Sequence, residues 1–294
     1  MTSASASASA AAAAAVDVPL DVKDFDPTDP KYAVDIDQYK PDKESSWPYP
    51  PSKDGWCLVH RALTQEVEQQ IVAYQSMMEQ AKSHKEGTTE TLTEWQLRCL
   101  QSAWEGHYQH VHWHHHDEDD YFGPQMSKRF IYPQRIASDH PKIEAQIDKV
   151  KTMIHALQVG DQIVDKLTPL VQEFEQYKSM IVPHMKEEET FVLPLLRAYF
   201  TPKDMEPIIQ TIATNGPKIE FGSAIYNCQG GPEGFRQEFM KQEGIPFFVW
   251  YIDFQFRLAE YERRVAKPLE ALQNGIPPVD GKAGFLPTGG CDIL

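Results

Sequence analysis

The sequence predicts an all-α protein, and three observations support this fold class. Apolar residues recur at intervals of three and four in four long stretches between Trp56 and Leu195, which is the period of a helix with one buried face. Glycine or proline follows each stretch where its period ends, as expected of helix termini. No stretch shows convincing strand-like alternation. Four amphipathic helices with short links favour an up-down-up-down four-helix bundle over about residues 56–200.

Residues 1–55 are predicted to form an arm outside this bundle. Residues 1–15 contain only Met, Thr, Ser and Ala, which is typical of a disordered tail. The rest of the arm is rich in Asp and Pro and has no helical period, so we expect it to be extended and to lie against the bundle. Trp47, Tyr49 and Trp56 are its expected anchors.

The helix boundaries follow from the positions of glycine and proline. Pro183 lies inside the fourth stretch and is expected to bend that helix. Residues 201–274 are predicted to form a helical cap, with helices near 203–213, 233–243 and 247–273, and residues 275–294 a flexible Gly/Pro-rich tail. The four long helices are expected from Trp56 to the polar stretch before Gly87, from Thr91 or Thr93 to Gly123-Pro124, from Ile136 to Leu157, and from Val164 to Leu195.

The composition is that of a globular chain with a large core. Of the 294 residues, 41% are hydrophobic and 11% aromatic, which suits one main domain with extensions. Lys and Arg total 28 against 43 for Asp and Glu, and the net charge is −15. Because this charge repels phosphate backbones, we expect no nucleic-acid partner. The four cysteines are far apart and form no C-x2-C pair, so neither a zinc–thiolate site nor a disulfide framework is predicted.

The two ends of the chain bear on its location. The first residues lack the features of a signal peptide and no segment has eighteen consecutive apolar residues, so we expect a cytoplasmic protein. The chain ends in Cys291-Asp292-Ile293-Leu294, which fits the C-a-a-X pattern for prenylation. Asp292 and the lack of an upstream basic cluster favour an unmodified terminus, and membrane association is expected only if Cys291 is prenylated.

One module, H-x3-E-x5-P, occurs twice in the chain. It reads HHHDEDDYFGP at residues 114–124 and HMKEEETFVLP at residues 184–194. A histidine and a glutamate four residues apart lie about 40° apart around a helix and roughly 6 Å apart along it, so both can point at one site. Two facing copies provide two imidazoles and two carboxylates, a set that suits a pair of transition-metal ions.

The first and third helices each add a histidine to this set. His60 and His140 lie on the apolar stripes of these helices. A single histidine on such a face is most often a hydrogen-bonded core residue, but burying six polar groups without partners would cost several kcal/mol each. Metal ions compensate all six together. The predicted metal ligands are His60, His114, Glu118, His140, His184 and Glu188.

These residues resemble the pattern of hemerythrin-like, or HHE cation-binding, domains: H…HxxxE…H…HxxxE with a proline soon after each glutamate. The resemblance covers about residues 56–200. It implies a non-haem centre of two iron ions, with manganese or zinc as the alternative metals. The implied roles are Glu118 and Glu188 bridging the ions, His60 and His114 on one ion, and His140 and His184 on the other. The alternative ferritin-like pattern, E-x-x-H, is not found at a plausible position.

The sequence differs from oxygen-carrying hemerythrins in the third helix. Those proteins offer two histidines four residues apart, whereas here Glu144 follows His140 at that spacing. Glu144 is therefore expected to be either a seventh ligand or a rim residue that hydrogen-bonds a ligand. The open coordination positions imply a centre that reacts with or senses dioxygen or peroxide, rather than one for reversible oxygen carriage.

Two other functions stay open from the sequence. The first is an iron-responsive interaction or regulatory module without turnover, in which metal holds the helices folded and the arm or the cap binds a protein partner. The second is a metal-free helical scaffold, for which removal of the buried carboxylates would improve stability. Whether the chain is an enzyme is not decided by its residues.

The remaining histidines of the second helix are predicted to have lesser roles. His107 and His110 are expected to face the interior as polar core groups. His115 is expected on a flank of the helix, and His112 and His116 toward solvent. Glu187 and Glu189, on either side of Glu188, are expected to form a solvated acidic rim.

Overall fold

The computed structural model describes residues 22–83, 90–228, 240–241 and 246–278. Within these ranges helices are the regular elements, and β-structure is limited to isolated bridges between Ala33 and Phe130 and between Thr91 and Gln162. The prediction of an all-α protein is therefore confirmed for this part of the chain. None of its helices combines the length and the apolar character needed to span a membrane.

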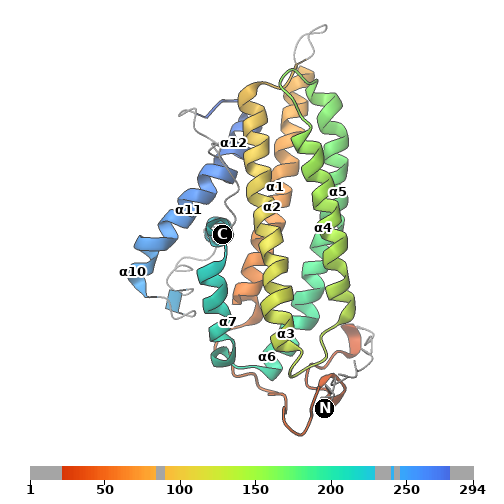
Figure 1. The fold of residues 1–294 in the computed structure, drawn as a ribbon, viewed down its shortest axis with the longest axis vertical. Coiled ribbons are helices and arrows are strands. Elements are labelled where there is room, and N and C mark those ends of the chain that lie inside the picture. Colours follow the sequence, from red (N-terminus) through yellow and green to blue (C-terminus); the bar gives the residue numbers. More distant parts are fainter. Residues whose placement is uncertain (1–21, 84–89, 229–239, 242–245, 279–294) are drawn as a thin grey trace, which may run out of the picture.

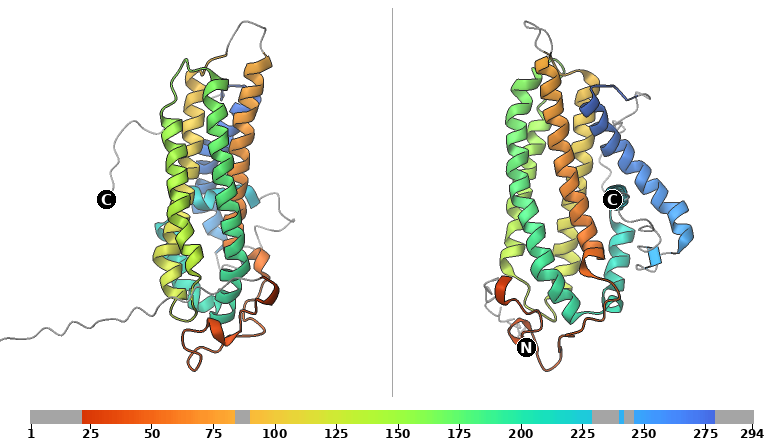
Figure 2. Two further views of the ribbon diagram at one scale, coloured as in Figure 1. Left: turned by 90° about the vertical axis from the view of Figure 1, so that its right-hand side faces the viewer. Right: turned by 180° about the vertical axis from the view of Figure 1, so that it is seen from behind.

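Four long helices run side by side, and each runs in the direction opposite to that of the next (Figures 1 and 2). Helix α1 contacts α2 and α5, and α4 contacts the same two helices. The four therefore enclose a common interior. Their bounds are Gly55–Ser83 for α1, Glu94–Asp117 for α2, Gln134–His155 for α4 and Ile163–Glu187 for α5.

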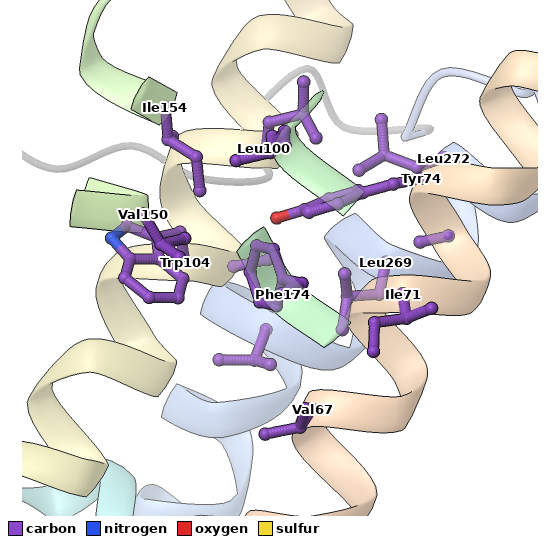
Figure 3. Close-up of a cluster of buried hydrophobic side chains, with 14 of the residues drawn as sticks. Val67, Ile71, Tyr74, Leu100, Trp104, Val150, Ile154, Phe174, Leu269 and Leu272 are labelled. Atoms are coloured by element: carbon purple, nitrogen blue, oxygen red, sulfur yellow. The ribbon is translucent and has the colours of Figure 1, made fainter. Parts of the chain in front are cut away.

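Aromatic and aliphatic side chains fill one end of this interior (Figure 3). The ring of Phe174 packs edge-on against Tyr74, with centroids 5.2 Å apart, and against Trp104, with centroids 5.3 Å apart. Leu269 and Leu272 of the C-terminal segment belong to the same buried cluster. The cap and the long helices therefore share one hydrophobic core.

The second and fourth helices do not stop at the ends that the sequence predicted. Helix α2 continues through a π-helical turn, Glu118–Phe122, into α3, Gly123–Met126. Helix α5 continues in the same way through the π-helical turn Glu188–Val192 into α6, Leu193–Tyr199. The predicted end at Gly123-Pro124 is therefore wrong, since helical backbone passes through both residues.

The π-helical turns explain why a proline follows each glutamate of the module. The N–H of Gly123 donates to the carbonyl of Glu118, and the N–H of Leu193 donates to that of Glu188. Each of these bonds spans five residues instead of four. The next residue in each copy is proline, which has no N–H to donate and would clash with the carbonyl four residues earlier in an α-helix. The wider turn accommodates the proline, and such turns are frequent at functional sites.

The C-terminal residues form a second layer of helices over α1 and α2. The predicted helix at 247–273 is found as continuous helical backbone, whereas α8 was not predicted and most of the predicted helix at 233–243 lies outside the described residues. Helices α8 and α12 both contact α1 and α2. The elements are α7 (Pro202–Asn215), α8 (Lys218–Cys228), α10 (Phe247–Val249), the π-helical turn Trp250–Phe254, α11 (Gln255–Tyr261), the π-helical turn Glu262–Ala266 and α12 (Lys267–Asn274).

The described part of the N-terminal arm lies at the end of the long helices where α6 is found (Figure 1). It contains three short 3-10 helices, Val22–Asp24, Pro30–Tyr32 and Pro51–Lys53. The indole N–H of Trp47 donates to the carbonyl of Phe200 at 2.8 Å. Trp56 is buried as well, whereas Tyr49 is half-buried. Residues 1–21 and Cys291 lie outside the described ranges, and the described cysteines are free.

Candidate metal centre

The six predicted ligands come together in the interior, near the ends of the long helices that adjoin α3 and α6. The i,i+4 spacing in α2 and α5 places the histidine and the glutamate of each module on the same face, while α1 and α4 each contribute one histidine. No residue of the set is more than 6% exposed. The residues are His60, His114, Glu118, His140, His184 and Glu188.

The six residues form two groups of possible ligands that share both glutamates. Within each group, one nitrogen or oxygen atom of every residue lies within 4.8 Å of those of the others. The groups are His60, His114, Glu118 and Glu188 on the α1–α2 side, and Glu118, His140, His184 and Glu188 on the α4–α5 side.

Each shared carboxylate presents one oxygen to each group. Oε1 of Glu118 lies 3.4 Å from Nε2 of His114, while Oε2 lies 3.4 Å from Nε2 of His140. Oε2 of Glu188 lies 3.3 Å from Nε2 of His60, while Oε1 lies 3.2 Å from Nε2 of His184. Each carboxylate could therefore contribute an oxygen to both groups.

The residues present fit a pair of metal ions. Nε2 of all four histidines and both oxygens of both glutamates are buried and have no hydrogen-bond partner. A buried polar atom without a partner costs about 1–3 kcal/mol, and more when it is charged. Eight such atoms gathered in one place could share metal ions as their partners, since transition-metal ions bind imidazole nitrogen and carboxylate oxygen together.

The electrostatics of the site depend on its two carboxylates. Burial, and then the charge of Glu188, raises the pKa of Glu118 to about 7. Burial also opposes ionisation of Glu188, but the neighbouring His140 and His184 outweigh it and hold its pKa well below the usual value. Burial lowers the pKa of His60, but Glu118, Glu189 and Glu188 together raise it to about 9. The carboxylates therefore favour positive charge beside them.

Further carboxylates contact the Nδ1 atoms on the far side of the imidazoles. Oδ1 of Asp119 lies 2.9 Å from Nδ1 of His140, and Oε1 of Glu189 lies 3.4 Å from Nδ1 of His60. Such partners fix the ring orientation and direct Nε2 toward a metal. Glu189 is therefore not simply part of a solvated rim, because it faces a candidate ligand.

His115 is more buried, and Glu144 closer to the centre's histidines, than a solvated flank would place them. His115 lies on a flank of α2, as predicted, but is only 3% exposed, and its Nδ1 donates to Oε1 of Glu144 at 2.7 Å. Glu144 belongs to neither ligand group that contains the glutamates, so the geometry favours a rim residue over a seventh ligand. His112 is exposed, as predicted, and His116 is half-buried.

A second buried polar cluster lies one to two helical turns from the centre. His107 and His110 face the interior as predicted, and both contact the carboxylate of Glu66 on α1. Sequence reasoning missed Glu66 because it treated this helix as an apolar stripe with a single histidine. The residue lies three positions before Gln69 and one before the buried Val67, so its position on the inner face could have been read from the helical period.

Comparison with protein-family models, with curated proteins and with solved structures gives no match for this chain. The function of the chain is therefore inferred from the geometry of this buried set of histidines and glutamates.

Proposed function

We propose that this chain is a hemerythrin-like protein with a non-haem di-iron centre that reacts with or senses dioxygen or peroxide. The observation that carries the proposal is the placement of Glu118 and Glu188, each with one oxygen toward either group of histidines. The antiparallel packing of α1, α2, α4 and α5 supports the up-down-up-down bundle of that family. Iron suits a mixed set of imidazoles and carboxylates, with manganese or zinc as the alternatives.

In this proposal His60 and His114 hold one ion, His140 and His184 hold the other, and the two glutamates bridge them. The bound ions supply the redox chemistry and the open positions for a small oxygen ligand. Asp119 keeps the proton of His140 on Nδ1, so that Nε2 is free to coordinate. Trp56 packs against His60, with ring centroids 6.1 Å apart, and contributes an apolar wall that excludes water.

Anaerobic reconstitution with ferrous iron tests the proposal. We expect close to two iron ions per chain and, on exposure to air, a new charge-transfer absorption in the near ultraviolet. The double variant Glu118→Ala with Glu188→Ala should bind neither ion, whereas Glu175→Ala, an exposed glutamate of the same helix α5, should bind both. A stoichiometry well below two in the wild type, or a spectrum unchanged by air, would contradict the proposal.

One observation favours the second candidate, an iron-responsive interaction module. Large apolar side chains are exposed along the segment from α10 to α11, which diverges from the long helices in Figure 1. They occur as two adjacent pairs four residues apart and one further residue four positions on, as expected of one helical face, and an exposed apolar patch is typical of a protein-binding surface. The residues, with exposed fractions of 50% to 77%, are Phe247, Phe248, Tyr251, Ile252 and Phe256.

The two candidates differ in what the bridging carboxylates are needed for. If the centre reacts with peroxide, the Glu118→Ala, Glu188→Ala variant loses peroxide consumption and metal together. If the centre only maintains the fold, the wild type consumes no peroxide and the variant shows only a lower melting temperature. Peroxide consumption by the iron-loaded wild type, measured beside the metal-free protein, separates them.

A further inference from the structure

His114 and His115 are adjacent in the sequence, but their imidazoles face different parts of the interior. Consecutive residues of an α-helix are separated by about 100°, and α2 packs against both α1 and α4. His114 contacts His60 of α1, with ring centroids 5.0 Å apart. His115 instead stacks on His140 of α4, with centroids 4.6 Å apart and an interplanar angle of 14°. Both residues are therefore inward-facing, on opposite edges of the buried face of α2.

The hydrogen bond to Glu144 determines which nitrogen of His115 is available. Nδ1 of His115 lies 2.7 Å from Oε1 of Glu144, and because a carboxylate only accepts, Nδ1 bears the proton. In the neutral ring Nε2 then holds a lone pair. This Nε2 atom is buried and has no hydrogen-bond partner. His115 thus offers the same free atom as His140, whose Nδ1 is held by Asp119.

His115 lies close to the ligands on the α4–α5 side. One nitrogen from each of His115, His140 and His184 lies within 4.8 Å of the other two, so three imidazoles can bind one ion if their rings turn toward it. The ring of His115 is also 5.9 Å from that of His184, edge to face. A carboxylate on Nδ1 and a buried, unpartnered Nε2 are together typical of a metal-binding histidine.

We propose that His115 is a fifth imidazole ligand of the centre, binding the ion held by His140 and His184, with Glu144 as its positioning residue. The inference rests on the metal function proposed above and makes the centre asymmetric. The ion on the α4–α5 side has three imidazoles, whereas the ion at His60 and His114 has two. Since both ions would share the bridging glutamates, the ion at His60 and His114 would have one protein ligand fewer than the ion at His140 and His184.

Titration of the full chain with Co²⁺ alone, under anaerobic conditions, tests this ligand. Bound Co²⁺ absorbs in the visible and shifts the N–H proton resonances of the imidazoles that coordinate it. The variant His115→Gln removes the imidazole and keeps an uncharged polar side chain of similar length. The matched control is His112→Gln, because His112 is an exposed histidine of the same helix whose Nδ1 lies 3.5 Å from Oε2 of Glu144.

The wild type and the His112→Gln control should bind two Co²⁺ ions and show five shifted imidazole N–H resonances. His115→Gln should leave the affinity for the ion at His60 and His114 unchanged, bind the ion at His140 and His184 at least tenfold more weakly and show four resonances. Glu144→Ala should weaken binding of the same ion at His140 and His184 about 10- to 100-fold, since it removes the partner that orients His115. Circular dichroism establishes that each variant keeps its helices.

The other outcomes are distinguishable. His115→Gln with both affinities and all five resonances of the control would overturn the inference and leave the metal centre intact. Loss of both ions from this variant, with its helices retained, would also contradict it, since only one ion should be affected. A wild type that binds no Co²⁺ would overturn the metal function and the fifth ligand together. If His115→Gln does not fold, the affinities of the Glu144→Ala variant for Co²⁺ test the inference in its place.

Discussion

Glu66 of α1 and His107 of α2 form a buried hydrogen-bonded pair, with 2.6 Å between Oε2 and Nδ1. Oε1 of the same carboxylate lies 3.1 Å from Nδ1 of His110 and contacts the hydroxyl of Ser223 on α8. Nε2 of His107 lies 3.0 Å from the hydroxyl of Tyr177 on α5. The carboxylate of Glu66 therefore links α8 of the cap to α1 and α2. His107 extends this hydrogen-bond network to α5.

This network should make stability dependent on pH on the acid side. Burial raises the pKa of Glu66, but His110 and His107 outweigh it and lower the pKa from 4.5 to about 2. A carboxyl with a depressed folded pKa contributes stability above its unfolded pKa and loses it as the pH falls through the folded value. We expect Glu66→Gln to lower the free energy of unfolding by about 1–3 kcal/mol at pH 6.

The difference in the free energy of unfolding between Glu66→Gln and the wild type should become smaller as the pH falls from 4.5 to about 2. Urea unfolding of the metal-free protein at a series of pH values measures it. Glu68→Gln is the control, because Glu68 is an exposed neighbour that pairs only at the surface with Lys178, at 3.2 Å. If Glu66→Gln lowered the free energy of unfolding equally at every pH, the charge of Glu66 would not explain the effect.

Glu118 should have opposite effects on stability with and without metal. In the metal-free protein, Glu118 and Glu188 are adjacent buried carboxylates, and Glu118→Gln removes one charge without changing the shape of the side chain. We expect the metal-free variant to be more stable than the metal-free wild type by about 1–3 kcal/mol. With ferrous iron the order should reverse, because ions that bind only the folded state stabilise it and the variant lacks a bridging ligand.

Thermal unfolding of both proteins, with a chelator and with ferrous iron, measures this reversal. Glu175→Gln, an exposed substitution on α5, should unfold like the wild type in both conditions. A metal-free Glu118→Gln variant that is less stable than the wild type would mean that the attraction of the carboxylate to His114 and His140 outweighs its repulsion from Glu188. Unfolding that iron does not change would contradict a metal centre.

The close crossing of α8 and α11 should depend on Gly222. A Cβ atom at this position would overlap the backbone carbonyl of Arg257, which cannot rotate away as a side chain can. We expect Gly222→Ala to destabilise the protein by about 1–3 kcal/mol through overpacking. Gly55→Ala is the matched control, since nothing lies within 4 Å of a Cβ there. Equal melting temperatures for the two variants would show that the cap adjusts to the added methyl group.

The helical period was sufficient to predict the all-α fold and to bring six distant residues to one place. A histidine and a glutamate four positions apart share a face in any helix, so His114 with Glu118 and His184 with Glu188 needed no knowledge of the neighbouring helices. His60 and His140 required only that their stripes face the same interior. Their grouping in the structure therefore follows from local geometry, while their role as metal ligands stays a prediction.

The contacts that the sequence did not predict depend on which helices are neighbours. The helical period carries no information about this. His115 lies 100° from His114 on an ideal helix, and it is interior because α4 packs on that side of α2. Glu66 accepts a hydrogen bond from Ser223, which lies on a helix that the sequence did not predict. The π-helical turns also shift the helical phase after Glu118 and Glu188, so a period read through these residues places later side chains on the wrong face.

The prolines of the repeated module should determine metal affinity through these turns. A π-helical turn is less stable than an α-helical one, and Pro194 favours it because the residue cannot donate an N–H and clashes in an uninterrupted α-helix. Alanine at this position would allow the backbone to return to bonds of four residues, and the start of the turn at Glu188 would rotate. We expect Pro194→Ala to keep its helical content while its affinity for ferrous iron falls at least severalfold.

A competition titration against a coloured iron chelator measures that affinity. Pro169→Ala is the control, because Pro169 also lies inside α5 but away from the π-helical turn. Pro124→Ala should reproduce the effect of Pro194→Ala, since Gly123 and Leu193 make the same five-residue bond to the preceding glutamate. Unchanged affinity in both variants would mean that the metal ligands alone maintain the turn, and the proline would then only tolerate a geometry that Glu118 and Glu188 impose.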